Sequence, residues 1–385
     1  MHRRHRLGSV LLWSASFLSR CPYKLKSMQS SSLSLNATSI EQALSSSVAG
    51  RPFLLDGGTG EELLRRGLPD DRQTWSAKAV SDPQYHDLLK LVHSSFLRAG
   101  SNAITTNSYG ITQHVGFTPQ QISYLCRTSA KIARQAVTES TGNNGAFVLG
   151  SLGPLSESYR PDLILSQKAC VTGYCLMVEA MQKDVDCFLA ETMSKIDEAT
   201  YAMDAVAKVC PEKPMMVSFT LGSDGNLRDG EQVPAALSRL IDFVSGKSIK
   251  CKYISNLQKK RKEKSSHVIL CNKVLAILFN CSEPEAISKC LKAVHESSDL
   301  TSLLKQRRIK LGAYANRLKA VDPDWTLADS EEAQPMRVDL SAEEYFHDFV
   351  SSWTRDLGVH IVGGCCGITP EHILLLRNKF SESIT

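Results

Sequence analysis

The sequence predicts a single catalytic domain of the α/β class with the (β/α)8 fold, the TIM barrel. Eight short apolar runs recur between residues 52 and 363, and seven of the intervals between them carry helix-forming stretches. Runs that are apolar throughout are typical of parallel strands covered on both faces by helices. Eight such units in roughly 330 residues match the strand count and the size of this barrel.

The expected elements alternate in order along the chain. Strands are expected at residues 52–56, 100–107, 145–150, 185–191, 213–219, 273–280, 309–314 and 358–363. Helices are expected at residues 61–65, 85–99, 119–138, 168–183 and 199–209, and another begins after Ser282. An open, doubly wound sheet is the alternative. Residues 56–60, Asp-Gly-Gly-Thr-Gly, disfavour it because they lack the spacing of a dinucleotide-binding turn.

The last expected strand runs into a Gly-Gly-Cys-Cys-Gly sequence at residues 363–367. Neighbouring residues on a strand point to opposite faces, so Cys365 and Cys366 can face one object only from a turn. Glycine allows a sharp turn because it enters the left-handed backbone region cheaply. Thr369 and Pro370 then indicate a helix start. Two thiols at such a turn suit a thiophilic metal; a vicinal disulfide or two small buried residues are the alternatives.

The formal net charge of +5 does not describe the body of the chain. Residues 1–40 hold six Lys or Arg and no acid, and residues 247–264 hold eight Lys or Arg against Glu263. Together these stretches carry +13, which leaves the remainder near −8. An acidic body argues against a nucleic-acid partner. No apolar run of about 18 residues occurs, so we expect no contact with a membrane through a spanning segment.

Residues 1–48 are expected to be a disordered N-terminal extension, with the barrel over residues 49–380. An Arg- and Ser-rich, acid-poor start is typical of a mitochondrial transit peptide. An upstream start, with Met28 as the working initiator, is the second interpretation, and a short secretory segment at residues 10–18 is the third. Twelve scattered cysteines indicate a reducing compartment. We therefore expect a cytoplasmic protein, with mitochondria as the alternative location.

Polar residues stand at the expected carboxyl ends of the strands, where barrels of this kind place their chemistry. These residues are Asp56, Thr106, Asn107, Ser151, Glu191, Ser218, Cys281, Asn316, Cys365 and Cys366. The sixth and eighth strands thus bring three thiols to one rim. Three Cys ligands with a free fourth position are the arrangement of a catalytic zinc site. We predict that Cys281, Cys365 and Cys366 bind Zn²⁺; a small buried residue is the alternative for Cys281 alone.

At these residues the chain resembles the homocysteine S-methyltransferases. The matching stretches lie between residues 53 and 373, at 55–60, 100–107, 150–154, 191–192, 280–281 and 363–366. The ordered pair Asn280-Cys281 and Gly-Gly-Cys-Cys is the most specific part. The resemblance implies a TIM barrel whose zinc is held by the three cysteines. It also implies a substrate site around the amino acid moiety of homocysteine, formed by Asp56, Gly57, Thr106, Asn107 and Glu191.

The expected reaction is methyl transfer from a small cationic donor to homocysteine, giving methionine. A thiol of this type has a pKa of roughly 8.5, and zinc would convert it to a thiolate. The thiolate then attacks the methyl group. Asp56 and Glu191 are the candidate catalytic residues, because they can bind the homocysteine ammonium and Glu191 can help draw in the cation. The alternative for each carboxylate is an ordinary polar strand end or helix cap.

Two features depart from the family pattern. A basic insertion at residues 245–272 crowds or replaces the helix before the strand that carries Cys281. It is either a solvated loop or a nuclear localisation signal. Only a helix and a short tail follow Cys366, whereas the betaine-using branch carries a longer extension for assembly. We therefore expect S-methylmethionine or S-adenosylmethionine as donor and a monomer. Betaine as donor is the alternative, as is a catalytically silent zinc-binding or thiol-redox barrel.

Overall fold

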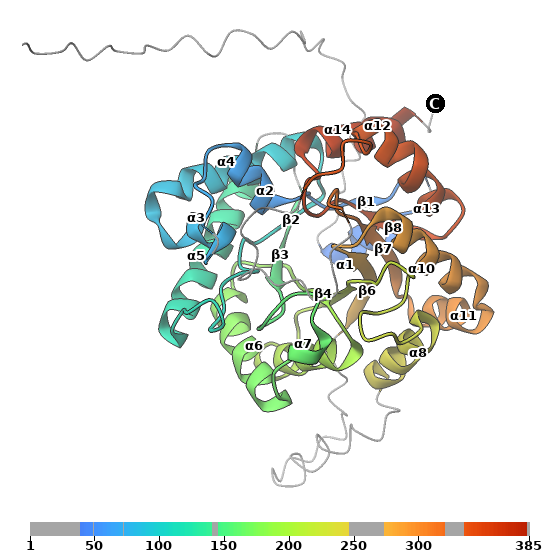
Figure 1. Cartoon of the computed structure of the whole chain (residues 1–385), viewed down its shortest axis with the longest axis horizontal. Coiled ribbons are helices and arrows are strands. Elements are labelled where there is room, and N and C mark those ends of the chain that lie inside the picture. The colour runs from blue at the N-terminus through green and yellow to red at the C-terminus, as the bar shows by residue number, and fades with distance from the viewer. Residues whose placement is uncertain are drawn as a thin grey trace, which may run out of the picture. The chain divides into compact units, whose positions relative to one another are not determined.

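The computed structural model describes residues 39–48, 50–71, 73–140, 145–245, 273–319 and 335–382. Its eight strands are parallel and form one sheet in the order β1-β8-β7-β6-β5-β4-β3-β2, with helices around it (Figure 1). This confirms the predicted (β/α)8 barrel. The strands are β1 (Phe53–Leu54), β2 (Ala103–Thr105), β3 (Phe147–Leu152), β4 (Cys187–Met193), β5 (Met215–Phe219), β6 (Val274–Asn280), β7 (Lys310–Tyr314) and β8 (Val359–Val362).

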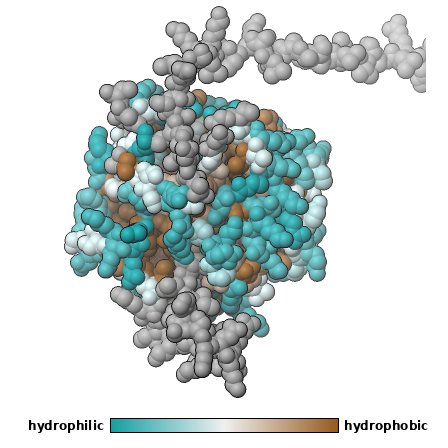
Figure 2. Space-filling model, turned by 180° about the vertical axis from the view of Figure 1, so that it is seen from behind, coloured by the Kyte–Doolittle hydropathy of each residue, from teal (hydrophilic) through white to brown (hydrophobic). Residues whose placement is uncertain are grey.

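The helices on the outside follow the strands in chain order. The longer ones are α2 (Thr59–Arg65), α4 (His86–Ala99), α5 (Pro119–Glu139), α6 (Gln167–Met181), α7 (Ile196–Val209), α8 (Val233–Val244), α10 (Pro284–Glu296), α11 (Ser298–Arg307) and α14 (Pro370–Glu382). Shorter ones are α3 (Lys78–Ser81), α12 (Ala342–Glu344) and α13 (Ser351–Arg355). No helix among these described parts is long and apolar enough to cross a membrane. Seen from behind, hydrophilic residues dominate and hydrophobic ones are scattered among them (Figure 2).

Local sequence signals set the ends of the outer helices. Thr118 caps α5 in a capping box with Gln121, and Pro119 occupies the first turn, where its missing N–H is not needed. The opposite signal ends α4, where Gly100 has a φ of +113° that a residue with a Cβ rarely adopts. These signals explain why the predicted and observed helix bounds agree within about three residues.

Side chains close the barrel between its first and second strands. Asn102 donates its backbone N–H to the Leu54 carbonyl oxygen (2.7 Å), and its side-chain oxygen accepts the Leu54 N–H (2.8 Å). Two residues after Leu54, the Asp56 carboxylate accepts the backbone N–H (2.7 Å) and the hydroxyl (3.0 Å) of Thr105. The seam is therefore held by polar side chains, and Asp56 is fixed in position by it.

A short helix, α1 (Ile40–Ser45), lies within the ring of strands in the view of Figure 1 and covers the end where the strands begin. Its Ile40, Ala43 and Leu44 are 2–3% exposed and belong to the core cluster inside the barrel. The boundary that we predicted at residue 48 differs from the structure here, because the packed body already includes α1. The sequence analysis missed this helix because three apolar residues in a Ser-rich stretch are too few to show a helical period. The rest of the predicted extension lies outside the described residues.

The helix before β6 is present, so the insertion does not replace it, which was one of the two effects that we expected. Helix α8 is amphipathic and buries Val233, Ala236, Leu237, Leu240 and Ile241. All seven residues of β6 are buried as well. The positioning of Cys281 is therefore undisturbed. Residues 246–272, with the predicted loop or localisation signal, lie outside the described residues.

Candidate functional site

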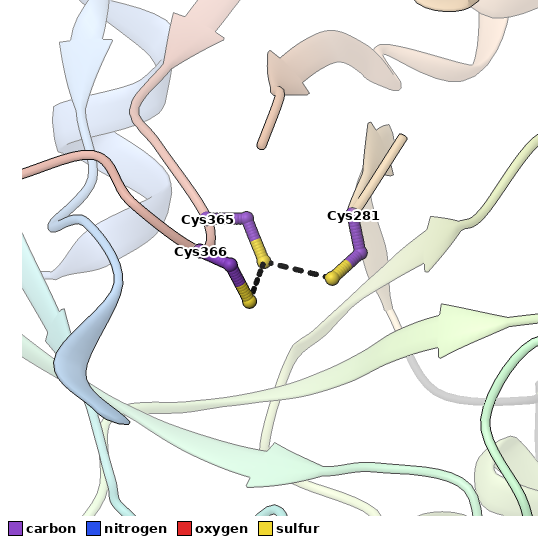
Figure 3. Close-up of side chains that lie close together, drawn as sticks. All are labelled: Cys281, Cys365 and Cys366. Carbon is purple, nitrogen blue, oxygen red and sulfur yellow. Dashed lines mark hydrogen bonds between the residues drawn. The ribbon is translucent and has the colours of Figure 1, made fainter. Parts of the chain in front are cut away.

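Three thiols meet at the carboxyl ends of β6 and β8. The side chains of Cys281, Cys365 and Cys366 point toward one another (Figure 3), and their Sγ atoms all lie within 4.8 Å of one another. Cys281 and Cys365 are 3.0 Å apart at Sγ, and Cys365 and Cys366 are 4.0 Å apart. The two neighbouring cysteines come from the turn after β8, as predicted. Three converging thiols within this span form a donor set that suits a thiophilic metal ion.

The backbone at Cys281 is held in an unusual conformation by its predecessor. Cys281 has a φ of +51°, in the left-handed region. The preceding Asn280 is fully buried, and its side-chain oxygen accepts the Ser218 hydroxyl (2.7 Å) and the Thr192 N–H (3.0 Å). Asn280 thus joins the ends of three neighbouring strands. This arrangement directs the Cys281 side chain toward the rim rather than along the strand.

Neighbouring strand ends hold the turn that carries the other two cysteines. The Cys365 N–H donates to the Ala315 carbonyl oxygen (2.8 Å), and the Cys366 carbonyl oxygen accepts the Arg317 N–H (2.8 Å). The hydroxyl of Tyr345 donates to the Gly363 carbonyl oxygen (2.8 Å). The turn is therefore held by the end of β7 and by the helical segment that contains Tyr345, between β7 and β8.

The glycines of this turn are needed for a reason other than the one we predicted. Neither Gly363 nor Gly364 has a positive φ, whereas Gly367 has a φ of +79°. A Cβ on Gly363 would lie 2.6 Å from the Leu55 Cβ, and one on Gly364 would lie 2.1 Å from the Ile368 side chain. Close packing against β1 and the start of α14 excludes side chains at these two positions.

The thiol cluster favours one negative charge even without a metal. Hydrogen bonds from the thiols of Cys365 and then Cys366 hold the pKa of Cys281 well below its ordinary value, although burial opposes this. The same hydrogen bond to Cys281 raises the pKa of Cys365. By contrast, burial alone raises the pKa of Cys126 to about 12. Cys281 therefore favours the thiolate, which is the form that binds metals, whereas the thiols buried in the core favour the protonated form.

The two predicted carboxylates lie on the same rim, where Asp56 is buried and Glu191 is half-buried. Glu191, on β4, accepts the Ser151 hydroxyl and the Tyr314 hydroxyl (3.4 Å). Burial raises the pKa of Glu191 to about 7 and that of Asp56 to about 6, and the nearby Asp56 charge also raises the Glu191 value. A cation bound between them would favour the ionised form of both groups.

A pocket of about 180 Å³ opens over the thiols and the carboxylates. Every residue that we predicted for substrate or metal binding lines it, namely Asp56, Gly57, Thr106, Asn107, Glu191, Cys281, Cys365 and Cys366. Ser151, Ser218 and Asn316, also predicted at strand ends, do not line it; Ser151 donates to Glu191, and Ser218 supports Asn280. No lysine, arginine or histidine is among the described residues that line the pocket. The pocket therefore favours cationic ligands.

Three aromatic walls of the pocket, which stand on loops, escaped the sequence analysis. Trp75, Tyr109 and Tyr159 stand on the segments that follow α2, β2 and β3. The Tyr159 hydroxyl donates to Cys281 Sγ (3.1 Å), and the Tyr109 hydroxyl lies 2.7 Å from the Ser158 hydroxyl. Loop aromatics follow no periodic pattern, so only their position in the fold identifies them. Aromatic faces near a thiol cluster provide contacts for an organic cation.

Comparisons with known proteins agree with this geometry. The family model described as homocysteine S-methyltransferase matches residues 53–380. Betaine-homocysteine S-methyltransferase of Drosophila melanogaster is 26% identical over 354 residues, covering 85% of this chain and 94% of the relative. Selenocysteine methyltransferase of Astragalus bisulcatus is 27% identical and covers 84% and 91%. Homocysteine S-methyltransferase of Escherichia coli (strain K12) is 26% identical and covers 85% and 94%.

A solved structure shares the fold. The metallated form of the homocysteine methyltransferase MmuM from Escherichia coli superposes with a TM-score of 0.60 at 23% identity. The match covers 85% of this chain and 96% of MmuM. At this level of identity the likeness supports the barrel architecture.

Proposed function

The chain belongs to the homocysteine S-methyltransferase family, and on this premise we propose that it transfers a methyl group from a sulfonium compound to homocysteine, giving methionine. The proposed donors are S-methylmethionine and S-adenosylmethionine. The observation that carries the proposal is the meeting of three thiols at a pocket in which the charged side chains, among the residues that the structure describes, are all acidic. Betaine is the second candidate donor, because a relative named for betaine matches about as well as relatives whose names give only the methyl acceptor.

We propose Zn²⁺ as the metal, held by Cys281, Cys365 and Cys366. Thiolates suit zinc, and three protein ligands leave a fourth position for a substrate thiol. When bound, the ion would supply a Lewis acid that favours the thiolate form of homocysteine at neutral pH. The cluster supports this assignment because it already stabilises a thiolate at Cys281.

The carboxylates are proposed to orient the amino acid moiety of homocysteine. Asp56 is fixed by Thr105, and Glu191 is fixed by Ser151 and Tyr314, so both present their charge in defined directions. An ammonium group between them would relieve the repulsion between the two negative charges. We propose Gly57, Thr106 and Asn107 as the further contacts of this substrate, since they line the same part of the pocket.

The aromatic walls are proposed to hold the donor cation. A sulfonium group placed against Trp75 and Tyr109 would be attracted by the negative ring faces. A new bond then forms between the homocysteine sulfur and the methyl carbon, while the electrons of the old sulfur–methyl bond stay with the donor sulfur. The donor leaves as a neutral thioether, and no proton has to move to it. Cationic charge disappears in this step, so the acidic pocket contributes to donor binding more than to product retention.

The decisive experiment is a parallel assay of the full-length chain with homocysteine and each of the three donors. With S-adenosylmethionine or betaine, methionine and the demethylated donor should appear in equal amounts. With S-methylmethionine the demethylated donor is itself methionine, so two methionines should form for each homocysteine consumed. Turnover should be fastest with a sulfonium donor. Removal of metal with a chelator should abolish turnover, and added Zn²⁺ should restore it. Turnover that survives complete removal of metal would contradict the zinc assignment, and a faster reaction with betaine would reverse the donor ranking.

The assembly and the location remain our predictions. We propose a cytoplasmic monomer, with mitochondria as the alternative, and residues 1–38, which bear on this choice, lie outside the described residues. Sedimentation of the purified chain tests the monomer. Fractionation of cells that express the full-length chain or a chain beginning at Met28 tests the location.

A further inference from the structure

We propose that Arg228 is a positioning residue of the thiol cluster, acting through Tyr159. Its guanidinium lies over the Tyr159 ring, and the Tyr159 hydroxyl donates to Cys281, so a fixed positive charge stands behind a metal-binding thiol. This inference rests on the proposed metal-dependent function. It identifies Arg228 as the cation that offsets the negative charge of the three thiols.

The geometry joins three loops at the rim. The guanidinium carbon of Arg228 lies 4.9 Å from the centre of the Tyr159 ring, and the Tyr159 hydroxyl lies 3.1 Å from Cys281 Sγ. These residues follow β5, β3 and β6, respectively. Tyr159 has a φ of +67°, which residues with a Cβ rarely adopt. Its surroundings therefore hold the ring in one position, between Arg228 and the thiol.

A structured loop presents Arg228. Leu221 and Leu227 form an antiparallel bridge, and the Gly222 N–H donates to the Asn226 carbonyl oxygen (2.9 Å). Gly225 closes the turn with a φ of +87°. A Cβ at that position would also lie 2.8 Å from the Lys289 side chain on α10. The loop is thus packed against the barrel, and Arg228 follows directly from its bridge.

The environment of Arg228 is unusual for a cation. Its Nε is buried without a hydrogen-bond partner, and no ion pair among the described residues includes it. Burial lowers the pKa of Arg228, whereas Tyr159, Cys281 and Glu283 nearby raise it. Arg228 is half-buried, and a cation partly removed from water without a paired anion is destabilising unless other charges compensate. The aromatic ring and the thiolate cluster are the compensation that the fold provides.

The charge of the cluster explains why a cation is useful there. Three thiolates around a divalent ion leave a net charge of −1, and the homocysteine thiolate adds another negative charge. Arg228 should therefore stabilise metal retention and homocysteine binding. It should contribute less to the transfer step, because the negative charge on sulfur disappears as the methyl group arrives. Neutralising Arg228 should accordingly raise the KM for homocysteine more than it lowers kcat.

The test compares Arg228→Met, Arg228→Lys and Tyr159→Phe in the full-length chain. Arg239→Met is the matched control, because Arg239 lies on the adjacent α8 and pairs with Glu231 in solvent. Zn²⁺ affinity is measured by chelator competition, and Co²⁺ is used to record the thiolate-to-metal charge-transfer band. Thermal unfolding of each metal-free variant reports packing separately.

Arg228→Met and Tyr159→Phe should bind Zn²⁺ about ten- to a hundredfold more weakly and shift the Co²⁺ band. Arg228→Lys should lie between Arg228→Met and the unmodified chain, and the control should match the unmodified chain. Unchanged affinity and an unchanged Co²⁺ band in both Arg228→Met and Tyr159→Phe would overturn the inference, even if stability fell. A chain that binds neither metal would overturn it as well. If the chain binds metal but transfers no methyl group, the proposed function is refuted. The inference about Arg228 is then decided by the Zn²⁺ affinities and the Co²⁺ band alone.

Discussion

The side chain of Asn280 forms two hydrogen bonds with Thr192, one residue after the Glu191 carboxylate. Its oxygen accepts the Thr192 N–H at 3.0 Å, and its nitrogen donates to the Thr192 hydroxyl at 2.9 Å. Thr192 and Cys281 both have positive φ values, +60° and +51°. The buried Asn280 side chain thus fixes the backbone next to the predicted metal ligand Cys281 and next to the predicted substrate-binding residue Glu191. This explains why asparagine and cysteine stand together at the end of β6.

We expect Asn280→Ala to weaken both stability and metal binding. The change leaves the Thr192 N–H and the Ser218 hydroxyl without their buried acceptor, which should lower the free energy of unfolding by about 3 kcal/mol. It also frees the Cys281 backbone. Denaturant unfolding and Zn²⁺ content check both effects. Asn378→Ala serves as control, because Asn378 is exposed on α14 and its side chain contacts Arg377 at the surface. Full Zn²⁺ content in Asn280→Ala would show that the cluster does not need this support.

Single alanine substitutions of Cys281, Cys365 and Cys366 should each lose metal and activity together. Two thiols and a water molecule hold zinc more weakly than three thiols, and the charge of the site changes. Metal analysis and methionine formation are measured on the same samples. Cys175→Ala is the control, since Cys175 is a partly buried thiol on α6 outside the pocket. If all three variants retained full Zn²⁺, the ligand assignment would be wrong.

Much of the barrel and of its rim could be predicted from the sequence because both follow local patterns. Eight apolar runs identify the strands, and the polar residue after each run identifies the rim. Side chains that reach the pocket from loops follow no such pattern, so Trp75, Tyr159 and Arg228 required the three-dimensional structure. Helix α1 was missed because three apolar residues are too few to show a period. Gly363 and Gly364 were predicted for the right turn but for another reason, since their role depends on neighbours distant in sequence.

Asp56→Asn and Glu191→Gln should keep Zn²⁺ and bind homocysteine more weakly. The asparagine oxygen can still accept the Thr105 N–H and its NH2 group can donate to the Thr105 hydroxyl, so the barrel seam should survive. A charged hydrogen bond contributes about 1.5–3 kcal/mol, which corresponds to an increase in KM of about ten- to a hundredfold. The measurement is the KM for homocysteine at saturating donor. An unchanged KM and kcat for either variant would remove that residue from the site.

Trp75→Leu should weaken the binding of the methyl donor more than the binding of homocysteine. Loss of one cation–aromatic contact of about 0.5–2 kcal/mol should raise the KM of a sulfonium donor by about two- to thirtyfold. The KM for homocysteine in the same variant is the internal control, because the predicted homocysteine contacts lie on other segments. An equal increase in both KM values would indicate a general distortion of the pocket, since Trp75 also packs against Gly60.

A buried carboxyl group outside the pocket should lower stability as the pH rises. Glu198, in the first turn of α7, is 2% exposed and accepts the Ser194 N–H at 2.8 Å. Burial raises the pKa of Glu198 from 4.5 to about 7. Between these two values the native state holds more protons than the unfolded chain, so the free energy of unfolding falls with rising pH in this window. Below about pH 4.5 and above about pH 7 this group contributes no slope.

Glu198→Gln should isolate this effect, because other groups titrate in the same range with the opposite sign. Burial lowers the pKa of His93 to about 4, so that residue makes the protein less stable as the pH falls from 6.5 toward 4. A total stability profile mixes the two contributions. The difference between Glu198→Gln and the unmodified chain removes the shared histidine term, and the variant should gain relative stability from pH 5 to pH 8. Denaturant unfolding at several pH values measures the difference, with the exposed Glu179→Gln as control. A difference that is independent of pH would mean that the pKa of Glu198 is not raised in the folded protein, so that the group is ionised in both the folded and the unfolded chain over this range.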